Sequence, residues 1–426
     1  MINGLKDTLS RRRILLIAPQ PFYTERGTPI AVKQLVEELL ACFPTLYIDI
    51  LTVAEGEPIF HPRLIIHRIK PPSVVSNFLK NMRPGVSIKK CVADLYLLKA
   101  AVQLMRQNKA SNFPYTLVHG VEEAAGIGWI LMRLFKIPYI YDMDSHLSEL
   151  VRAKWWWVGP GEQILKRIES QIMCDSLATI AVCDSLAKVA YSANTPKVVI
   201  LRDFAIPSNN SQNNNHPNIQ SLIQAPADSM IVLYVGNFEP YQGTDLLVQA
   251  WQNINENAHL VLIGGTLADI ERTKNLIRSL PSDAQNKIHL LGPRPLPELP
   301  YLLAQADILV SPRRYGTNTP MKLYSYLAAG KPIIATAIES HLQIIDNQSA
   351  VLTEVSSHAL AEGINSLLNN PVRCKALGEA AKNLADNKYS QRAFRETLIS
   401  LYSSLLNIKL EYSSALDEKT NEESIK

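Results

Sequence analysis

Cysteine is scarce in this chain, and the cysteines follow no ligand spacing. The 426 residues include five, without a Cys-x-x-Cys pair: Cys42, Cys91, Cys174, Cys183 and Cys374. A disulfide framework or a structural zinc site would require an ordered set of paired cysteines. We therefore expect reduced thiols, a cytoplasmic location and no bound metal.

Long apolar runs are also absent. No stretch reaches the roughly eighteen apolar residues that a membrane-spanning helix needs, and the start, MINGLKDTLSRRR, has no apolar core of a signal peptide. Apolar residues still make up 47% of the chain and charged residues 19%, as in a soluble globular protein. At this length the prior expectation is two domains.

The charge has little excess of either sign, but it is unevenly distributed. The formal net charge is +4, composed of +7 up to Phe204 and −3 in the remainder. A basic first half suits a surface that meets phosphates or anionic lipid, and it suits an ordinary solvated face equally well. Lys89 and Lys90 start a predicted helix in this half, so peripheral contact with the inner membrane face stays open.

The most informative stretch is LVSPRRYGTNTPMKLYSYLAAGKPIIAT, residues 309–336. An apolar strand leads into a polar loop, Thr319-Pro320 then starts a helix with Pro at its first position, and a second strand follows Gly330. A helix that starts directly after a strand directs unpaired N–H groups and a positive dipole end at the crevice above the sheet. Phosphates bind at such places.

A similar unit stands near the N-terminus. Residues 14–18 are an apolar strand, residues 19–27 form a loop with Arg26, and Thr28-Pro29 opens a helix. The chain thus repeats strand, polar loop, Thr-Pro and helix once in each half. Two such turns facing each other would hold a diphosphate between domains.

Strands and helices alternate through both halves. This alternation predicts an α/β fold of two doubly wound parallel-sheet domains that face each other across a cleft. A segment rich in Asn, Ser and Pro separates the halves. We expect a first domain at 1–206, a linker at 207–229, a second domain at 230–385, a helix at 386–407 that packs back on the first domain, and a disordered tail at 408–426.

Titratable residues follow two successive strands of the first half. His119 comes after a strand at 115–118, and Asp142-Met143-Asp144-Ser145 comes after a strand at 138–141. Open α/β sheets bind ligands at this edge. His119 is therefore either a ligand contact or a histidine hydrogen-bonded to backbone at a strand end.

Three adjacent tryptophans, Trp155 to Trp157, cannot all face one core from a regular element. Some would then be exposed at a partner surface, an acceptor site or a membrane interface. The alternative is a long loop packed onto its own domain.

Taken together, these features resemble the retaining GT-B glycosyltransferases of family 4, which take a sugar from a nucleotide diphosphate. The resemblance covers residues 13–406. Four segments carry it: Gly27-Thr28-Pro29, His119 with DMDS at 142–145, GNFEPYQGTDLL from Gly236, and SPRRYGTNTPMKLYSYLAAGKPIIAT from Ser311. It implies an acceptor-side first domain, a second domain that binds a nucleotide-sugar donor, and a glycan, lipid-linked or small-molecule acceptor. It implies no cofactor and no nucleic-acid partner.

The resemblance also assigns roles to residues. It places His119, as the catalytic residue, beside the transferred sugar, with Asp142, Asp144 and Ser145 as sugar or acceptor contacts. Positions where the family usually carries an Arg and a Lys on the pyrophosphate hold Asn237 and Gln242. Positions where its signature helix usually carries two glutamates hold Thr317 and Ser325.

The diphosphate still needs countercharge, because a helix N-terminus supplies only about half a unit. We expect Arg313, Arg314 and Lys322 to provide it. The complete expected donor-binding set is Gly27, Thr28, Gly236, Asn237, Gln242, Gly243, Arg313, Arg314, Thr317, Asn318, Thr319, Lys322 and Ser325. The neutral replacements leave an alternative, a catalytically silent GT-B-fold protein that binds a sugar or nucleotide.

Overall fold

The computed structural model describes residues 11–25, 27–80, 87–109, 111–148, 151, 161–206, 217–254 and 257–406. The predictions for the tryptophan run at 155–157, for linker residues 207–216 and for the tail at 408–426 lie outside these ranges. Among the described helices, none combines the length and the apolar character that crossing a membrane requires.

The first sheet has seven parallel strands in the order β3-β2-β1-β4-β5-β6-β7. The strands are β1 (Arg12–Ala18), β2 (Leu46–Thr52), β3 (Leu64–Arg68), β4 (Leu117–Val121), β5 (Tyr139–Met143), β6 (Ala178–Ala181) and β7 (Val198–Ile200). The helices of this part are α2 (Gly27–Cys42), α3 (Ser73–Leu79), α4 (Ile88–Lys109), α5 (Ala124–Phe135), α7 (Glu162–Asp175) and α8 (Asp184–Ser192).

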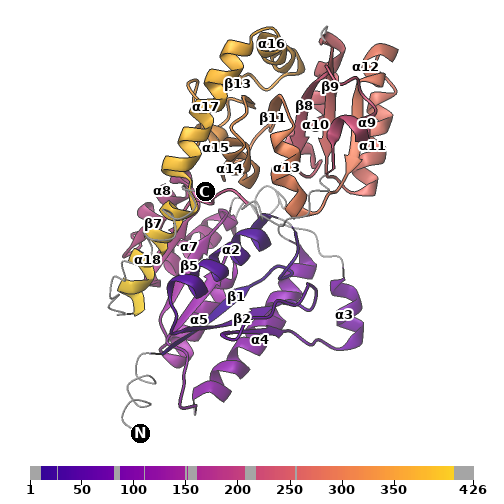
Figure 1. Cartoon of the computed structure of the whole chain (residues 1–426). Helices are drawn as coiled ribbons and strands as arrows, with labels where there is room; N and C mark the ends of the chain where they lie inside the picture. Colours follow the sequence, from indigo (N-terminus) through magenta and orange to yellow (C-terminus); the bar gives the residue numbers. More distant parts are fainter. Residues whose placement is uncertain are drawn as a thin grey trace.

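Strand β1 shows why the central strands are continuous apolar runs. Ile14 and Leu16 join the core that includes α2, whereas Leu15 and Ile17 join the core that includes α4 and α5. Successive side chains of a strand point to opposite faces, and both faces of this sheet are covered by helices. Every position of the strand interior is therefore apolar (Figure 1).

The second sheet has six parallel strands in the order β10-β9-β8-β11-β12-β13. The strands are β8 (Met230–Val235), β9 (Ala258–Ile263), β10 (Ile288–Gly292), β11 (Ile308–Ser311), β12 (Ile333–Thr336) and β13 (Val351–Thr353). The helices and short 3₁₀ turns are α9 (Ile219–Ile223), η2 (Pro240–Gln242), α10 (Thr244–Ala250), η3 (Trp251–Asn253), α11 (Leu267–Ile277), α12 (Ser282–Asn286), η4 (Leu296–Glu298), α13 (Leu299–Ala304), α14 (Met321–Ala328), α15 (Glu339–Leu342), α16 (Ser357–Leu368) and α17 (Pro371–Lys388).

The two sheets share one topology, and the predicted fold class is confirmed. In each, the first strand in sequence lies between its second and fourth, so the direction of winding reverses there. Ligands of open α/β sheets bind at the carboxyl ends of the strands beside this reversal. The loops at the two reversals follow β1 and β4 in the first domain, and β8 and β11 in the second.

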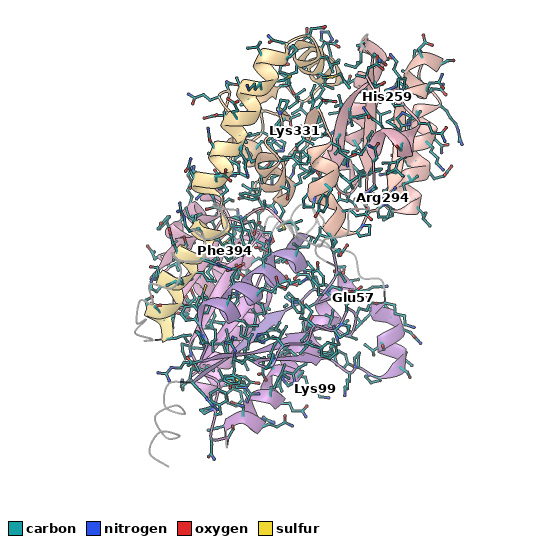
Figure 2. All side chains as sticks on the ribbon, viewed as in Figure 1. Glu57, Lys99, His259, Arg294, Lys331 and Phe394 are labelled. Atoms are coloured by element: carbon teal, nitrogen blue, oxygen red, sulfur yellow. The ribbon has the colours of Figure 1, made fainter. Side chains whose placement is uncertain are left out.

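The last described helix, α18 (Gln391–Leu406), returns to the first domain. Phe394, Leu398 and Tyr402 belong to the core built on β1 and α2, and Arg395 forms an ion pair with the buried Glu38 of α2. Figure 2 labels Phe394 among the elements of the first domain, far along the chain from them. The exact domain boundaries stay predictions.

Candidate functional site

Arg313 lies in the loop after β11 and is only 6% exposed. Its guanidinium donates to the carbonyl oxygens of Tyr315 and Asn318, at 3.0 and 2.9 Å, and to Oδ1 of Asn318 at 2.9 Å. It also lies over the ring of Tyr241, 5.2 Å from the centroid. These partners are all neutral, and burial lowers the pKa of Arg313 because it disfavours the charged form.

Lys322, the second residue of α14, brings another cation to the same place. Its Nζ donates to Oε1 of Gln242 at 2.9 Å and lies 4.0 Å from the ring centroid of Tyr234. Burial, together with the charge of Arg313, holds the pKa of Lys322 well below the usual value of 10.5. Two largely buried cations that repel each other and contact only neutral groups are the arrangement expected of an anion site.

The neighbouring Arg314 has a different environment. It donates to Oδ2 of Asp245 on α10 at 2.6 Å, and its side chain is 33% exposed. Its charge is therefore already neutralised. Of the two adjacent arginines, Arg313 alone is held among neutral partners.

The turn after β8 is shaped by glycines. Gly236 and Gly243 have φ of +147° and +69°. A Cβ on Gly243 would lie 2.0 Å from the carbonyl oxygen of Pro312, so this turn is pressed against the end of β11. Asn237 lies in the turn, where its Oδ1 accepts from the N–H of Glu239 at 3.2 Å.

Three further predicted donor residues, Thr317, Thr319 and Ser325, lie in the loop before α14 or within this helix. The carbonyl oxygen of Thr317 accepts from Nε2 of Gln343 at 2.8 Å, and Thr319 Oγ1 lies 3.3 Å from Oη of Tyr324. Ser325 is buried within the helix. Pro320 is the N-cap residue, one position before the first helical residue where we expected it.

In the first domain, His119 lies inside β4 rather than after it, and it is 0% exposed. Its Nδ1 is 2.5 Å from Oη of Tyr402, and its Nε2 is 2.9 Å from Oδ2 of Asp142. The ring therefore joins the C-terminal helix to the carboxyl end of β5.

Three carboxylic acids gather at that end of the first sheet. Burial and the charge of Asp142 raise the pKa of Asp144 well above its usual value, although Asp144 accepts a hydrogen bond from the hydroxyl of Thr28. Asp203, which follows β7, is 8% exposed, and burial together with Asp142 raises its pKa to about 7. The sequence reasoning missed Asp203, although it follows a strand just as Asp144 does.

Lys90 also departs from expectation, because it is not a free surface cation. Its side chain is 12% exposed and lies 2.7 Å from Oε1 of Glu123 and 3.6 Å from Oε2 of Glu122. Glu122 has φ of +50°, accepts from Nε2 of Gln20 and lies 3.5 Å from Oγ of Ser145. The two glutamates thus have a buried lysine as partner as well as a place at the start of α5.

The starts of α2 and α14 approach one group of side chains. Thr28 donates to Asp144, whose pKa is raised in part by Asp203. Asp203 in turn helps to raise the pKa of Tyr324, after the larger effect of burial, and Tyr324 contacts Thr319. The two predicted helix starts are thus linked electrostatically through Asp144, Asp203 and Tyr324.

Direct contacts join the two domains around this group. The N–H of Ser185 on α8 donates to Oε1 of Gln343 at 2.9 Å, and that of Leu296 donates to Oε2 of Glu25 at 3.1 Å. Figure 2 labels Arg294 and Glu57 on the sides where the two domains face each other.

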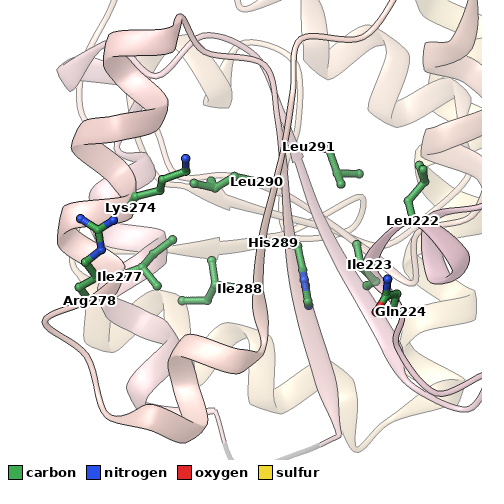
Figure 3. A pocket seen from close by; sticks show the side chains of 10 residues that line it. All are labelled: Leu222, Ile223, Gln224, Lys274, Ile277, Arg278, Ile288, His289, Leu290 and Leu291. Carbon is green, nitrogen blue, oxygen red and sulfur yellow. The ribbon is translucent and has the colours of Figure 1, made fainter.

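A cavity with a volume of about 430 Å³ lies elsewhere, along β10 between α9 and α11. Figure 3 shows its lining side chains, with Lys274 and Arg278 on one side and Leu222 on the other. Among the described residues, no group of three or more His, Cys, Asp or Glu is arranged to hold a metal ion.

Comparison with known sequences places this geometry in context. Residues 217–384 match the family model described as Glycosyl transferases group 1. The chain is 23% identical over 318 residues to a D-inositol 3-phosphate glycosyltransferase of Corynebacterium aurimucosum, covering 70% of this chain and 73% of the relative. It is 31% identical over 157 residues to an uncharacterized glycosyltransferase of Methanocaldococcus jannaschii, covering 36% and 42%.

Solved structures share the fold. Sucrose-phosphate synthase from Thermosynechococcus elongatus superimposes with a TM-score of 0.75 at 19% identity, over 93% of this chain and all of the other. The Anabaena protein HepE, solved in complex with UDP and glucose, gives a TM-score of 0.66 at 16% identity over 92% and 100%. At these identities the likeness is one of architecture.

Proposed function

We propose that this chain, whose residues 217–384 match the family model described as Glycosyl transferases group 1, transfers a sugar from a nucleotide-diphosphate donor to an acceptor with retention of anomeric configuration. The observation that carries this proposal is the pair formed by Arg313 and Lys322. Both are cations held largely out of water among neutral groups, beside the reversal point of the second sheet. A donor diphosphate would supply the missing negative charge.

The position of Lys322 supports this assignment. The turn after β8 offers neutral Asn237 and Gln242, but the ammonium of Lys322 reaches that turn from α14 and bonds to Gln242. Because Gly236 has no side chain, it leaves room for the ammonium of Lys322. A Cβ on Gly236 would lie 3.0 Å from Nζ of this lysine. The charge needed at the turn is thus supplied by another element.

Catalysis follows from stabilisation of the leaving group. As the bond from the anomeric carbon to the diphosphate oxygen breaks, charge develops on the diphosphate, and Arg313 and Lys322 stabilise it in place. The acceptor hydroxyl attacks from the same face, and the β-phosphate accepts its proton. His119 has no exposed surface with which to contact the sugar, so it acts through Asp142, whose side chain is 15% exposed.

The second candidate is a catalytically silent protein that binds a sugar or nucleotide. The neutral residues at 237, 242, 317 and 325 favour it. The two functions differ in donor breakdown, because a competent site slowly transfers the sugar to water.

The test begins with a panel of nucleotide sugars in a thermal shift assay. The donor that stabilises the protein most is then incubated without acceptor, and the anomer first released is identified by NMR. Release of the sugar with its donor configuration supports a retaining transferase. Binding without any release supports the silent protein, and failure of every nucleotide sugar to bind contradicts both.

A lipid-linked acceptor and peripheral membrane contact form a finer part of the proposal. On α3, Val74 is 80% exposed and Phe78 is 45% exposed, and Nζ of Lys89 lies 5.6 Å from the Phe78 ring centroid. Apolar groups beside a lysine suit an anionic membrane surface. Val74→Ser with Phe78→Ser should reduce sedimentation with anionic vesicles, whereas Val372→Ser, at a site 81% exposed on α17, should not. Equal sedimentation of all variants would remove this part.

A further inference from the structure

A single side-chain amide, that of Gln343, connects the first domain to the loop that carries Arg313. Its Oε1 accepts from the N–H of Ser185 at 2.9 Å, and its Nε2 donates to the carbonyl oxygen of Thr317 at 2.8 Å. Ser185 belongs to α8 of the first domain, Gln343 follows α15 of the second, and these two helices meet at the domain junction (Figure 1). The reverse orientation of the amide would set donor against donor and acceptor against acceptor, so both bonds fix it as it stands.

The start of α8 explains the bond to Ser185. The first N–H groups of a helix have no partner within it. The N-cap residue of α8 is Cys183, which makes no side-chain capping hydrogen bond within the part of the chain that the structure describes. Gln343 of the second domain supplies a partner for one of these N–H groups, and the hydroxyl of Ser185 donates to Glu339 of the same domain. These bonds exist only while the two domains are in contact.

The carbonyl oxygen of Thr317 also has a donor from the first domain. Sγ of the buried Cys183 lies 3.6 Å from it and faces the backbone N–H of Thr319 as well. Cys183 and Ser185 are two positions apart, so the start of α8, Gln343 and Thr317 form a closed ring of contacts. The loop before α14 is therefore held from both domains at one peptide group.

That peptide group adjoins the residue that holds Arg313. Asn318 follows Thr317, and its carbonyl oxygen and its Oδ1 both accept from the Arg313 guanidinium, each at 2.9 Å. The peptide unit is planar and rigid, so a shift of the Thr317 carbonyl carries the backbone of Asn318 with it. The guanidinium would then lose the partners that direct it.

Resting on the proposed function, we infer that Gln343 is a positioning residue, which holds Asn318, and through it Arg313, in place while the two domains are in contact. The diphosphate site of the second domain thus depends on the first domain. Diphosphate binding and domain contact favour each other, because a ligand that binds one arrangement more tightly shifts the population toward it.

The experiment measures UDP and UMP binding to the full chain by calorimetry. Gln343→Met has a similar length and neither amide group, so it should lose about fivefold or more in UDP affinity, with UMP affinity kept within about twofold. UMP is the internal reference, because it lacks the diphosphate that Arg313 contacts. Ser185→Pro removes the N–H of the first domain at a place in the first helical turn where proline is tolerated, and it should narrow the preference for UDP in the same way. Gln348→Met, at an exposed glutamine beyond α15, is the matched control and should change neither affinity.

An unchanged preference for UDP over UMP in Gln343→Met would overturn the inference, and a lower melting temperature alone would mean that Gln343 serves stability. Equal losses for UDP and UMP would also overturn it, because they indicate a general loosening of the second domain. A loss in Gln343→Met without one in Ser185→Pro would overturn the part played by domain contact. If Gln343→Met does not fold, Cys183→Ala removes the other donor to Thr317 and must narrow the preference instead. A wild type that does not prefer UDP would count against the proposed function.

Discussion

Nε2 of His119 lies 2.9 Å from Oδ2 of Asp142, at the buried end of a short chain of polar groups. On its other side the ring meets Tyr402 of α18 through Nδ1. The last described helix of the chain therefore fixes the orientation of a histidine in the first sheet, and through it that of Asp142. Tyr402 is a positioning residue on this account.

Tyr402→Phe tests this relationship. The variant keeps the ring but leaves Nδ1 of a buried histidine without its partner, which should cost about 1–3 kcal/mol of stability. We expect the rate of donor breakdown to fall about tenfold with an unchanged donor KM, and its pH profile to shift. Tyr191→Phe, at an exposed position on α8, is the control. If stability falls and both the rate and the pH profile stay unchanged, Tyr402 serves packing alone.

Asp203 predicts a dependence of stability on pH. Its pKa is about 7 in the folded protein and 3.8 for an unperturbed carboxyl group, so between these values the folded state binds the proton more tightly. The free energy of unfolding should therefore fall as pH rises from about 4 to about 7. Asp203→Asn should flatten this fall. The free energy of unfolding of the variant, relative to that of the wild type, should be more than about 1 kcal/mol higher at pH 8 than at pH 4, because one pKa unit is worth about 1.4 kcal/mol. Urea unfolding at both pH values measures it, and parallel curves for the two proteins would contradict it.

Gly243→Ala tests the turn that faces Lys322. The added Cβ would lie 2.0 Å from the carbonyl oxygen of Pro312, and the φ of +69° is unfavourable for alanine. We expect a loss of at least about 1 kcal/mol in stability and weaker UDP binding, because the turn must move away from β11. Gly126→Ala, on α5, meets no atom closer than 3.7 Å and is the control. Similar UDP affinities for the two variants would show that this turn does not shape the site.

Lys322→Met should separate stability from binding. Burial lowers the pKa of Lys322, so the charged form destabilises the unliganded protein, and this cost fades as pH rises. Removing the charge should raise the melting temperature of the unliganded protein at pH 7 and abolish most of the increase that UDP produces. A lower melting temperature with an intact UDP effect would identify Lys322 as structural.

The sequence predicted the fold well because its signals are local. Continuous apolar strands such as residues 14–17 and the Thr-Pro helix starts depend on neighbours within a few residues, and the fold class is confirmed. The same local reasoning proposed Arg313 and Lys322. It could not tell which of Arg313 and Arg314 lacks a negative partner, because Arg314 pairs with Asp245, which lies 69 residues away in sequence.

Contacts across long distances in sequence account for what was missed. Tyr402 meets His119 across 283 residues, so no local pattern could show that the histidine is enclosed. Lys90 looked like a surface cation because its pairing with Glu122 and Glu123 depends on how α4 packs against α5. Asp203 stands in an ordinary strand-end context, and only the assembled sheet brings it toward Asp142.

The most direct measurement compares UDP and UMP binding by calorimetry in the wild type, Arg313→Gln, Lys322→Gln and Arg314→Gln. UDP carries the diphosphate and UMP does not, so the wild type should prefer UDP. Arg313→Gln and Lys322→Gln should each lose about tenfold or more in UDP affinity, with little change for UMP, and Arg314→Gln should bind as the wild type does because Asp245 already pairs with that arginine. Unchanged UDP affinity in both Arg313→Gln and Lys322→Gln would contradict the claim that these two cations hold the donor diphosphate.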